Sequence, residues 1–256
     1  MKLRLLILCF VAFIFAACSS DDSFEPSSVK KIPITMEWID KDGSKKICNY
    51  KYDTQNRLTE YNVTDGAEEQ YKFTLSYNAS GELSKMEEYA KNLLYRTHEF
   101  TYNGGTIIAK RVYSDKDPLS DNIKVDGNNR MTELEFIDKT GNYTYKYTYD
   151  KKGNITDALF CKDKEHSSTD GRTYDNKNGM LSAIDVPLWV FTYLEDNFTF
   201  FCGVNNLVSQ TWTANYDETI PVATVLSISY DYDENDYPTK FTSGNDVVTI
   251  TYVTTK

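Results

Sequence analysis

The sequence predicts an all-β protein, an antiparallel up-and-down meander of repeated hairpins that is closed or nearly closed into a barrel. Three observations lead to this prediction. A turn motif recurs with a nearly fixed period, the residues before each turn alternate between apolar and polar, and helix signals are almost absent. Two strands for each repeat give a total of roughly fourteen to eighteen.

The turn motif begins with Tyr or Val followed by Asp or Asn, and it ends on Met, Ile, Leu or Pro. Its seven copies are Tyr52–Leu58, Tyr77–Leu83, Tyr102–Ile107, Val125–Met131, Tyr149–Ile155, Tyr174–Met180 and Tyr232–Pro238. By subtraction of position numbers, the first six copies start 25, 25, 23, 24 and 25 residues apart. A period of this size indicates a repeat architecture.

Strands with one buried and one solvated face are predicted before each turn, because large apolar residues alternate there with polar ones. The clearest examples are Tyr71–Tyr77, Tyr143–Tyr149, Leu226–Tyr232 and Val248–Tyr252. A second, more charged strand follows each turn, as in Arg57–Val63, Leu83–Tyr89, Met131–Ile137 and Ile155–Phe160. Asp, Asn and Gly in the turns tolerate left-handed backbone conformations, so each repeat is predicted to be a hairpin.

Closure of the sheet is expected because open twisted sheets curl or close beyond ~10 strands, and closure removes exposed edges. The 20 Tyr residues support a large sheet, since Tyr is a good strand former and pairs well across strands. Glu87–Leu94 is the one stretch with a weak helical option, and it has no capping signal.

The region Asp185–Thr219 breaks the repeat and is rich in aromatic residues. Two further strands, Leu188–Leu194 and Phe198–Gly203, are predicted there. The aromatic residues are either the densest part of the core or a platform for a sugar or an apolar ligand. The candidate ligand-binding residues are Trp189, Tyr193, Phe198 and Trp212.

The first residues are predicted to be a targeting segment. Lys2 and Arg4 precede an apolar run, Leu5–Phe15, that is too short to cross a bilayer as a helix. The run ends in Phe15-Ala16-Ala17-Cys18, which resembles a bacterial lipobox. The resemblance implies a signal peptide at 1–17 and lipidation of Cys18, which would attach the protein to a membrane; a plain secretory signal is the alternative.

Residues 18–30 are predicted to be a flexible tether, and 31–256 a single β-meander domain. The polar, acidic and Ser-containing stretch after Cys18 suits a tether. It also resembles the export tag that directs Bacteroidota lipoproteins to the cell surface, which implies an outer-membrane, surface-exposed location; a periplasm-facing anchor is the alternative. Cys48, Cys161 and Cys202 match no metal pattern, and in an oxidising compartment two of them could pair.

The turn element, as in Tyr52–Leu58 and Tyr149–Ile155, resembles the YD repeats of Rhs-type proteins, which build β-sheet shells. Together with the lipobox and the length, it is similar to a Bacteroidota lipoprotein family of unknown function with a porin-like fold. This family implies an architecture and no catalytic residues. A true porin is not expected, because strands such as Glu82–Glu88 would place carboxylates against lipid.

No catalytic constellation is found in the sequence. There are two histidines: His98 lies in a predicted strand without a partner nearby in sequence, and His166 is predicted to lie in an exposed loop. No GxSxG, P-loop, HExxH or dinucleotide motif occurs. The run Asp231–Asp236 lacks the Gly and Glu that a calcium loop needs. We therefore expect no catalytic residue, no metal site and no cofactor.

The formal net charge of −10, without a long Lys/Arg cluster, argues against nucleic-acid binding. The leading hypothesis is a non-enzymatic, lipid-anchored envelope protein that binds a glycan or a protein, or acts as a scaffold. A glycan hydrolase using carboxylates at the barrel mouth is the second hypothesis. A carrier of an apolar ligand, which requires an empty lumen, is the third.

Overall fold

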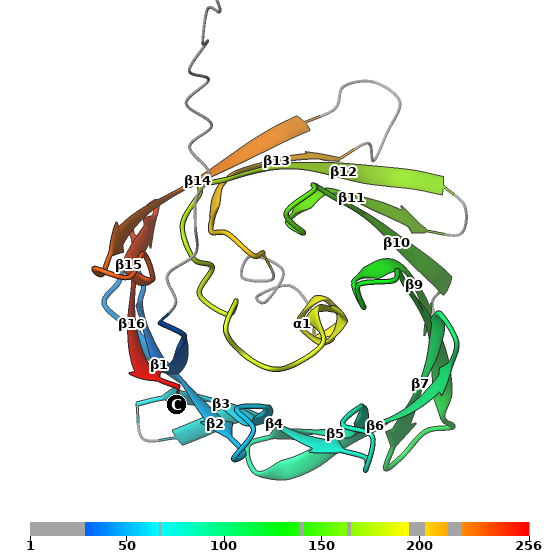
Figure 1. Ribbon diagram of the computed structural model, residues 1–256. Helices are drawn as coiled ribbons and strands as arrows, with labels where there is room; N and C mark the ends of the chain where they lie inside the picture. Colours follow the sequence, from blue (N-terminus) through cyan, green and yellow to red (C-terminus); the bar gives the residue numbers. More distant parts are fainter. Residues whose placement is uncertain are drawn as a thin grey trace, which may run out of the picture.

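The computed structural model describes residues 29–66, 68–138, 141–162, 165–194, 203–214 and 222–255. Sixteen antiparallel strands form a closed barrel in which successive strands pair and β1 pairs with β16 (Figure 1). The predicted all-β meander is confirmed, and it is closed. The strands are β1 Lys31–Ile39, β2 Lys45–Tyr52, β3 Leu58–Asp65, β4 Glu68–Tyr77, β5 Leu83–Ala90, β6 Leu93–Asn103, β7 Thr106–Tyr113, β8 Leu119–Val125, β9 Met131–Asp138, β10 Gly141–Tyr149, β11 Ile155–Lys162, β12 Glu165–Tyr174, β13 Leu207–Ala214, β14 Val222–Tyr232, β15 Pro238–Ser243 and β16 Asp246–Thr254.

One local prediction is wrong: His166 lies in β12 and not in a loop. Pairing of β12 with the neighbouring strands decides this, which a single segment of sequence does not show. Glu87–Leu94, where the sequence offered a weak helical option without a capping signal, forms the end of β5 and the start of β6, joined by a turn with positive φ at Lys91 and Asn92.

The repeat turns owe their shape to the Asp or Asn that starts them. In the first turn, Oδ1 of Asp53 accepts the backbone N–H groups of Gln55 and Arg57 at 2.8 and 3.0 Å, and Asn56 takes a positive φ of 62°. Asn and Gly tolerate this conformation better than most residues. The same acceptor role falls to Asn78, Asp126, Asp150 and Asp233 in later copies.

The Tyr of several motifs bonds to the turn that precedes it. The hydroxyl of Tyr77 donates to the carbonyl of Leu58, which closes the preceding turn, at 2.7 Å. Tyr102 donates in the same way to Leu83, and Tyr149 to Met131. Similar bonds run from Tyr52 to Pro33 in β1 and from Tyr252 in β16 to Pro238. The repeat therefore places a series of tyrosine hydrogen bonds along one rim of the barrel.

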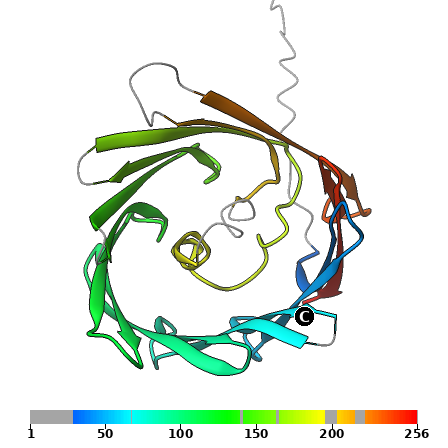
Figure 2. The ribbon, with the colours of Figure 1, turned by 180° about the vertical axis from the view of Figure 1, so that it is seen from behind.

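The sixth motif is interrupted by an insertion. In the first, second, fourth, fifth and seventh turns the N–H of the Asx residue donates to the carbonyl four residues later, as Asp53 does to Arg57. In the sixth motif Asp175 donates to Asn206 at 3.0 Å, and Tyr174 is paired with Leu207. Leu207, and not Met180 as predicted, therefore closes this turn. Residues 176–194 and 203–205, here called the plug, enter the barrel (Figures 1 and 2).

The plug contains the helix α1 (Leu188–Tyr193), so the predicted strand Leu188–Leu194 is wrong. Residues 189–193 are all buried. A segment that stands in a lumen has no strand edge to pair with, and a helix satisfies its backbone groups internally. Within the described ranges, no helix is long and apolar enough to cross a membrane. The second predicted strand, Phe198–Gly203, lies almost entirely outside the described residues.

We predict that Tyr77→Phe lowers the free energy of unfolding by about 1–2 kcal/mol, because the carbonyl of Leu58 loses its donor. Denaturant titration of the purified protein measures this change. Tyr71→Phe is the control, since Tyr71 is 57% exposed, and it should leave the value nearly unchanged. Equal values for the two variants would contradict a structural role for this series of tyrosine hydrogen bonds.

Candidate functional site

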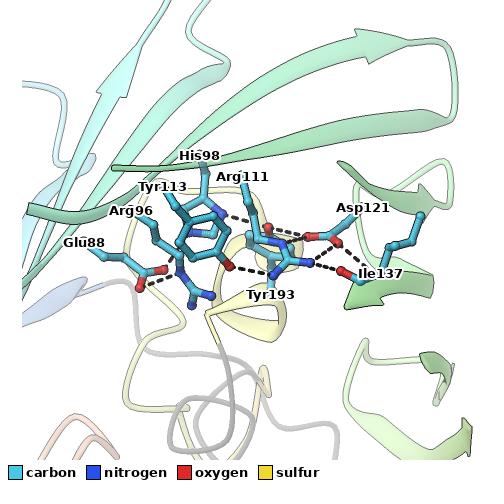
Figure 3. Close-up of polar contacts among 8 residues, drawn as sticks. All are labelled: Glu88, Arg96, His98, Arg111, Tyr113, Asp121, Ile137 and Tyr193. Carbon is cyan, nitrogen blue, oxygen red and sulfur yellow. Dashed lines mark hydrogen bonds and ion pairs between the residues drawn. The ribbon is translucent and has the colours of Figure 1, made fainter. Parts of the chain in front are cut away.

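Buried polar side chains connect α1 to the barrel wall on the side formed by β5 to β9 (Figure 3). Such groups are rare inside proteins and need partners. We call this set the luminal polar network, and its members are Glu88, Arg96, His98, Arg111, Asp121 and Tyr193.

Strand alternation and register bring the wall residues of this network together. Glu88 on β5 lies opposite Arg96 on β6, and His98 on β6 lies opposite Arg111 on β7. Side chains two residues apart on a strand share a face, so these groups point into the lumen while Glu99 and Lys110 pair on the outside. Tyr193 reaches the network from the last residue of α1.

Tyr193 bonds the plug to the wall at the end of α1. Its hydroxyl lies 2.8 Å from Nδ1 of His98 and donates to Oδ2 of Asp121 at 3.0 Å. Nε2 of His98 lies 2.6 Å from Oε1 of Glu88. Burial raises the pKa of Tyr193 well above its ordinary value, so the hydroxyl keeps its proton. Tyr193 thus joins groups from two strands, β6 and β8, and His98 extends the connection to Glu88 on β5.

Arg111 and Asp121 form a fully buried ion pair, with side chains 2% and 0% exposed. Nε of Arg111 lies 2.7 Å from Oδ2 of Asp121, and an Nη atom donates to Oδ1 at 2.9 Å. The guanidinium also stacks 3.9 Å from the ring centroid of Phe136 and donates to the carbonyl of Ile137. These bonds compensate the cost of removing both charges from water.

The charge state of His98 follows from its burial. Burial lowers the pKa of His98, and the nearby carboxylate of Glu88 acts in the opposite direction. Burial alone would raise the pKa of Glu88, but the hydrogen bond with His98 and the charge of Arg96 outweigh it, and that pKa is lowered. A neutral His98 donating to an ionised Glu88 fits both directions. With its proton on Nε2, His98 presents Nδ1 as an acceptor. The hydroxyl proton of Tyr193 then has two acceptors within reach, Nδ1 of His98 and Oδ2 of Asp121.

The chemistry of this network suits attachment of the plug. It contains no Ser, Cys or Lys nucleophile, and its groups are in contact with each other and with the rings of Phe100 and Trp189, which lie 5.2 Å apart. Among the described residues, no group of three or more His, Cys, Asp or Glu side chains is placed to hold a metal ion. Because Tyr193 of α1 bonds to His98 and Asp121 of the wall, we describe the network as a latch, meaning a side-chain attachment between α1 and the wall.

A second attachment lies where the plug leaves the wall. Asn154 of the fifth turn exchanges two hydrogen bonds with Asn205, at 2.9 and 3.0 Å. Asn178 donates to the carbonyl of Asn235 in the seventh turn at 2.9 Å. A Cβ on Gly179 would lie 2.5 Å from the carbonyl oxygen of Gly203, so the two ends of the plug pass each other too closely for any other residue.

The sequence identified part of this arrangement. Trp189 and Tyr193 are 1% and 6% exposed and belong to the core around α1. Phe198 and the lipidation residue Cys18 lie outside the described residues, and of Trp212 only the backbone, in β13, is described. Sequence reasoning missed Glu88, Arg96, Arg111 and Asp121. Their signal is a charged residue at an apolar position of a strand, as Arg111 is between Ala109 and Tyr113.

The remaining sequence predictions concern thiols and the lumen. Cys48 and Cys161 are free thiols, and Cys202 lies outside the described residues. The apolar-carrier hypothesis requires an empty lumen, whereas the core of this barrel includes the buried residues of α1. This observation does not favour that hypothesis.

Comparison with known proteins gives structural neighbours only. No protein-family model matches the chain, and no curated protein is significantly similar in sequence. A crystal structure of a porin-like protein from Bacteroides uniformis ATCC 8492 has 12% identity and a TM-score of 0.44, covering 90% of this chain and 98% of that chain. A porin-like protein from Bacteroides vulgatus ATCC 8482 has 12% identity and a TM-score of 0.44, with coverages of 87% and 99%. At this level of similarity, the barrel assignment rests on the strand pairing of the chain itself.

We predict that Asp121→Asn lowers the free energy of unfolding by about 3–5 kcal/mol, because it leaves Arg111 buried without a counter-charge. Denaturant titration measures the loss. The double variant Arg111→Met/Asp121→Leu removes both charges and should recover most of it. Glu99→Gln, which breaks the exposed pair with Lys110, is the matched control and should have little effect. A loss in that control as large as in Asp121→Asn would contradict the assignment.

Acidification should weaken the barrel through His98. Because its folded pKa is lowered from the ordinary value of about 6.5, the unfolded chain takes up the proton first as the pH falls. The free energy of unfolding should therefore fall below pH ~6.5 until the folded pKa is passed, and Glu88 should add a further loss below about 4.5. The measurement is stability against pH, with His98→Gln as comparison. An unchanged slope between pH 7 and 5 in that variant would exclude His98 as the cause.

Proposed function

We propose that this protein is a lipid-anchored protein of the bacterial outer membrane whose barrel stands in water and acts without catalysis, as a binding or scaffold module. The observation that carries the proposal is the distribution of polarity, with a largely apolar interior that holds the plug and with charged and polar pairs across the outer face. A membrane-spanning barrel has the opposite arrangement, with an apolar outer band and a polar lumen.

The outer face supports a barrel surrounded by water. Polar and charged side chains of neighbouring strands pair across it, near the middle of the strands as well as at their ends. These pairs include Asn49–Asn62, Lys51–Glu60, Thr74–Glu87, Lys110–Glu99, Asn122–Glu135, Lys124–Glu133 and Ser229–Thr242. Charged groups at these depths would be costly against lipid tails, whereas in water they favour solubility.

The plug supports a role other than transport through the barrel. The latch at Tyr193 and the attachment at Asn154 hold the plug at two places. The side chains that form these two attachments are buried. A plug held by a buried ion pair and by several hydrogen bonds would be costly to remove. The interior therefore suits a rigid support for an external binding surface.

The tether would join the barrel at the rim that carries the repeat turns. Lys31, at the start of β1, forms an ion pair of 2.7 Å with Asp233 of the seventh turn. Cys18 lies 13 positions before Lys31 in the sequence, by subtraction. An extended chain spans at most ~3.5 Å per residue, so this length would hold the barrel within roughly 45 Å of the bilayer surface.

We expect Cys18→Ala to abolish incorporation of labelled fatty acid and to move the protein from the membrane to the soluble fraction, with its β-sheet circular dichroism unchanged. Fractionation of a host that processes bacterial lipoproteins measures this. Cys9→Ala is the matched control, because Cys9 lies in the predicted signal peptide and should not affect anchoring. Persistence of the Cys18→Ala protein in the membrane fraction would contradict the lipid anchor and favour a barrel inserted in the bilayer.

A further inference from the structure

A cavity of about 680 Å³ opens at the rim of the barrel that carries the repeat turns. Three of these turns, the first, second and fourth, line it together with the part of the plug that leads into α1. The residues that define its chemistry are Gln55, Ser80, Asn128, Asp185, Pro187 and Leu188. The volume is within the range of 300–1,000 Å³ that is typical of small-molecule sites.

The three turns present side chains from the same position of the motif. Gln55, Ser80 and Asn128 each follow the Asp or Asn of their turn by two residues, and each donates its backbone N–H to that Asx side chain at 2.8–2.9 Å. The turn therefore uses only the backbone of this position. In the part of the chain that the structure describes, these three side chains make no hydrogen bond, and they are exposed toward the cavity.

The charges around the cavity disfavour an anionic ligand. Arg57, which also lines it, is held by Asp53, with Nε 2.7 Å from Oδ2, and its guanidinium lies 4.4 Å from the ring centroid of Tyr77. Its charge is thus compensated by Asp53. Asp185 is the carboxylate of the described lining and is exposed. Within the described lining, a phosphate or carboxylate ligand would meet Asp185 and no cation that lacks a counter-charge.

The polar and apolar walls together match the chemistry of a sugar. Amide and hydroxyl side chains both donate and accept hydrogen bonds, as sugar hydroxyls do, and Asp185 adds an acceptor. Pro187 and Leu188 form a half-buried apolar wall against which the C–H face of a pyranose ring can pack. The plug residues are fixed by the latch at Tyr193, so the wall is preorganised.

We propose that this rim cavity binds a short, neutral oligosaccharide. The inference rests on the proposed function and deepens it by naming the binding surface and the ligand class. Binding without cleavage fits the described lining, since glycoside hydrolysis generally needs a pair of carboxyl groups about the scissile bond. Asp185 is the carboxylate of this lining, and the oxygens of nearby Asp53 already accept hydrogen bonds from Arg57 and from the backbone of its turn.

The test is calorimetric titration of the processed, detergent-solubilised protein with maltotriose, cellotriose, mannotriose and triacetylchitotriose, and with trigalacturonic acid as an anionic probe. At least one neutral trisaccharide should bind saturably, and trigalacturonic acid should bind more weakly. The double variant Gln55→Ala/Asn128→Ala should weaken that binding at least tenfold. Its thermal unfolding should not change, because neither side chain takes part in the turn.

Lys152→Ala is the matched control, because Lys152 holds the same position in the fifth turn and does not line the cavity. It should bind as the unchanged protein does. The proposal is overturned if none of the neutral sugars binds, if the double variant binds equally well, or if the anionic probe binds best. Chromatography of the titrated sugars separates the two proposals: cleavage products would contradict a non-catalytic function, while the loss of binding in the double variant would still identify the cavity.

Discussion

The width of the barrel is the constraint on which the rest of the structure depends. Sixteen strands spaced ~4.8 Å apart and tilted by about 40° close into a cylinder roughly 30 Å across. Side chains from the wall cannot fill such a space, and an unfilled lumen would be lined with Tyr, Phe, Leu and Met in contact with water. A helix with its side chains is about 10 Å across, so α1 supplies the missing central layer. The lumen is therefore built as a protein core around a helix.

This constraint explains why charged groups occur inside. A helix surrounded on all sides by apolar residues can rotate or slide with little change in buried area, whereas directional bonds define one position. Tyr193, bonded to His98 and Asp121, supplies such bonds at the end of α1. The charges of the wall groups around Tyr193 are balanced within the network. Arg111 pairs with Asp121, and Glu88 contacts both Arg96 and His98. The buried polar groups therefore define one position of α1 in the lumen, rather than adding a large net contribution to stability.

The repeat acts as a frame that leaves some positions free to vary. Its Asx residue shapes each turn, its Tyr bonds to a neighbouring turn, and its last residue is buried, as Leu58, Leu83 and Met131 are. At the position two residues after the Asx, only the backbone N–H takes part in the turn, so the side chain can vary. This position carries Gln55, Ser80, Asn128 and Lys152 in different copies. From the sequence alone the motif is explained by turn and strand formation, whereas in the structure its variable position also lines a cavity at the rim.

By itself, the sequence determined the strands, their alternation, the turns and an approximate strand number, because these depend on interactions within one repeat. Tyr71–Tyr77 alternates because one face of β4 is buried, and Asp53 shapes its own turn. The sequence predicted a closed or nearly closed barrel, and the tertiary structure decided that β1 pairs with β16. Only the tertiary structure decided the helical state of Leu188–Tyr193 and the partners of His98. Trp189, Phe191 and Tyr193 alternate as a strand would, yet in the lumen there is no edge to pair with. Tyr193 and Asp121 are 72 residues apart in sequence, and only closure of the barrel around the plug brings such groups into contact.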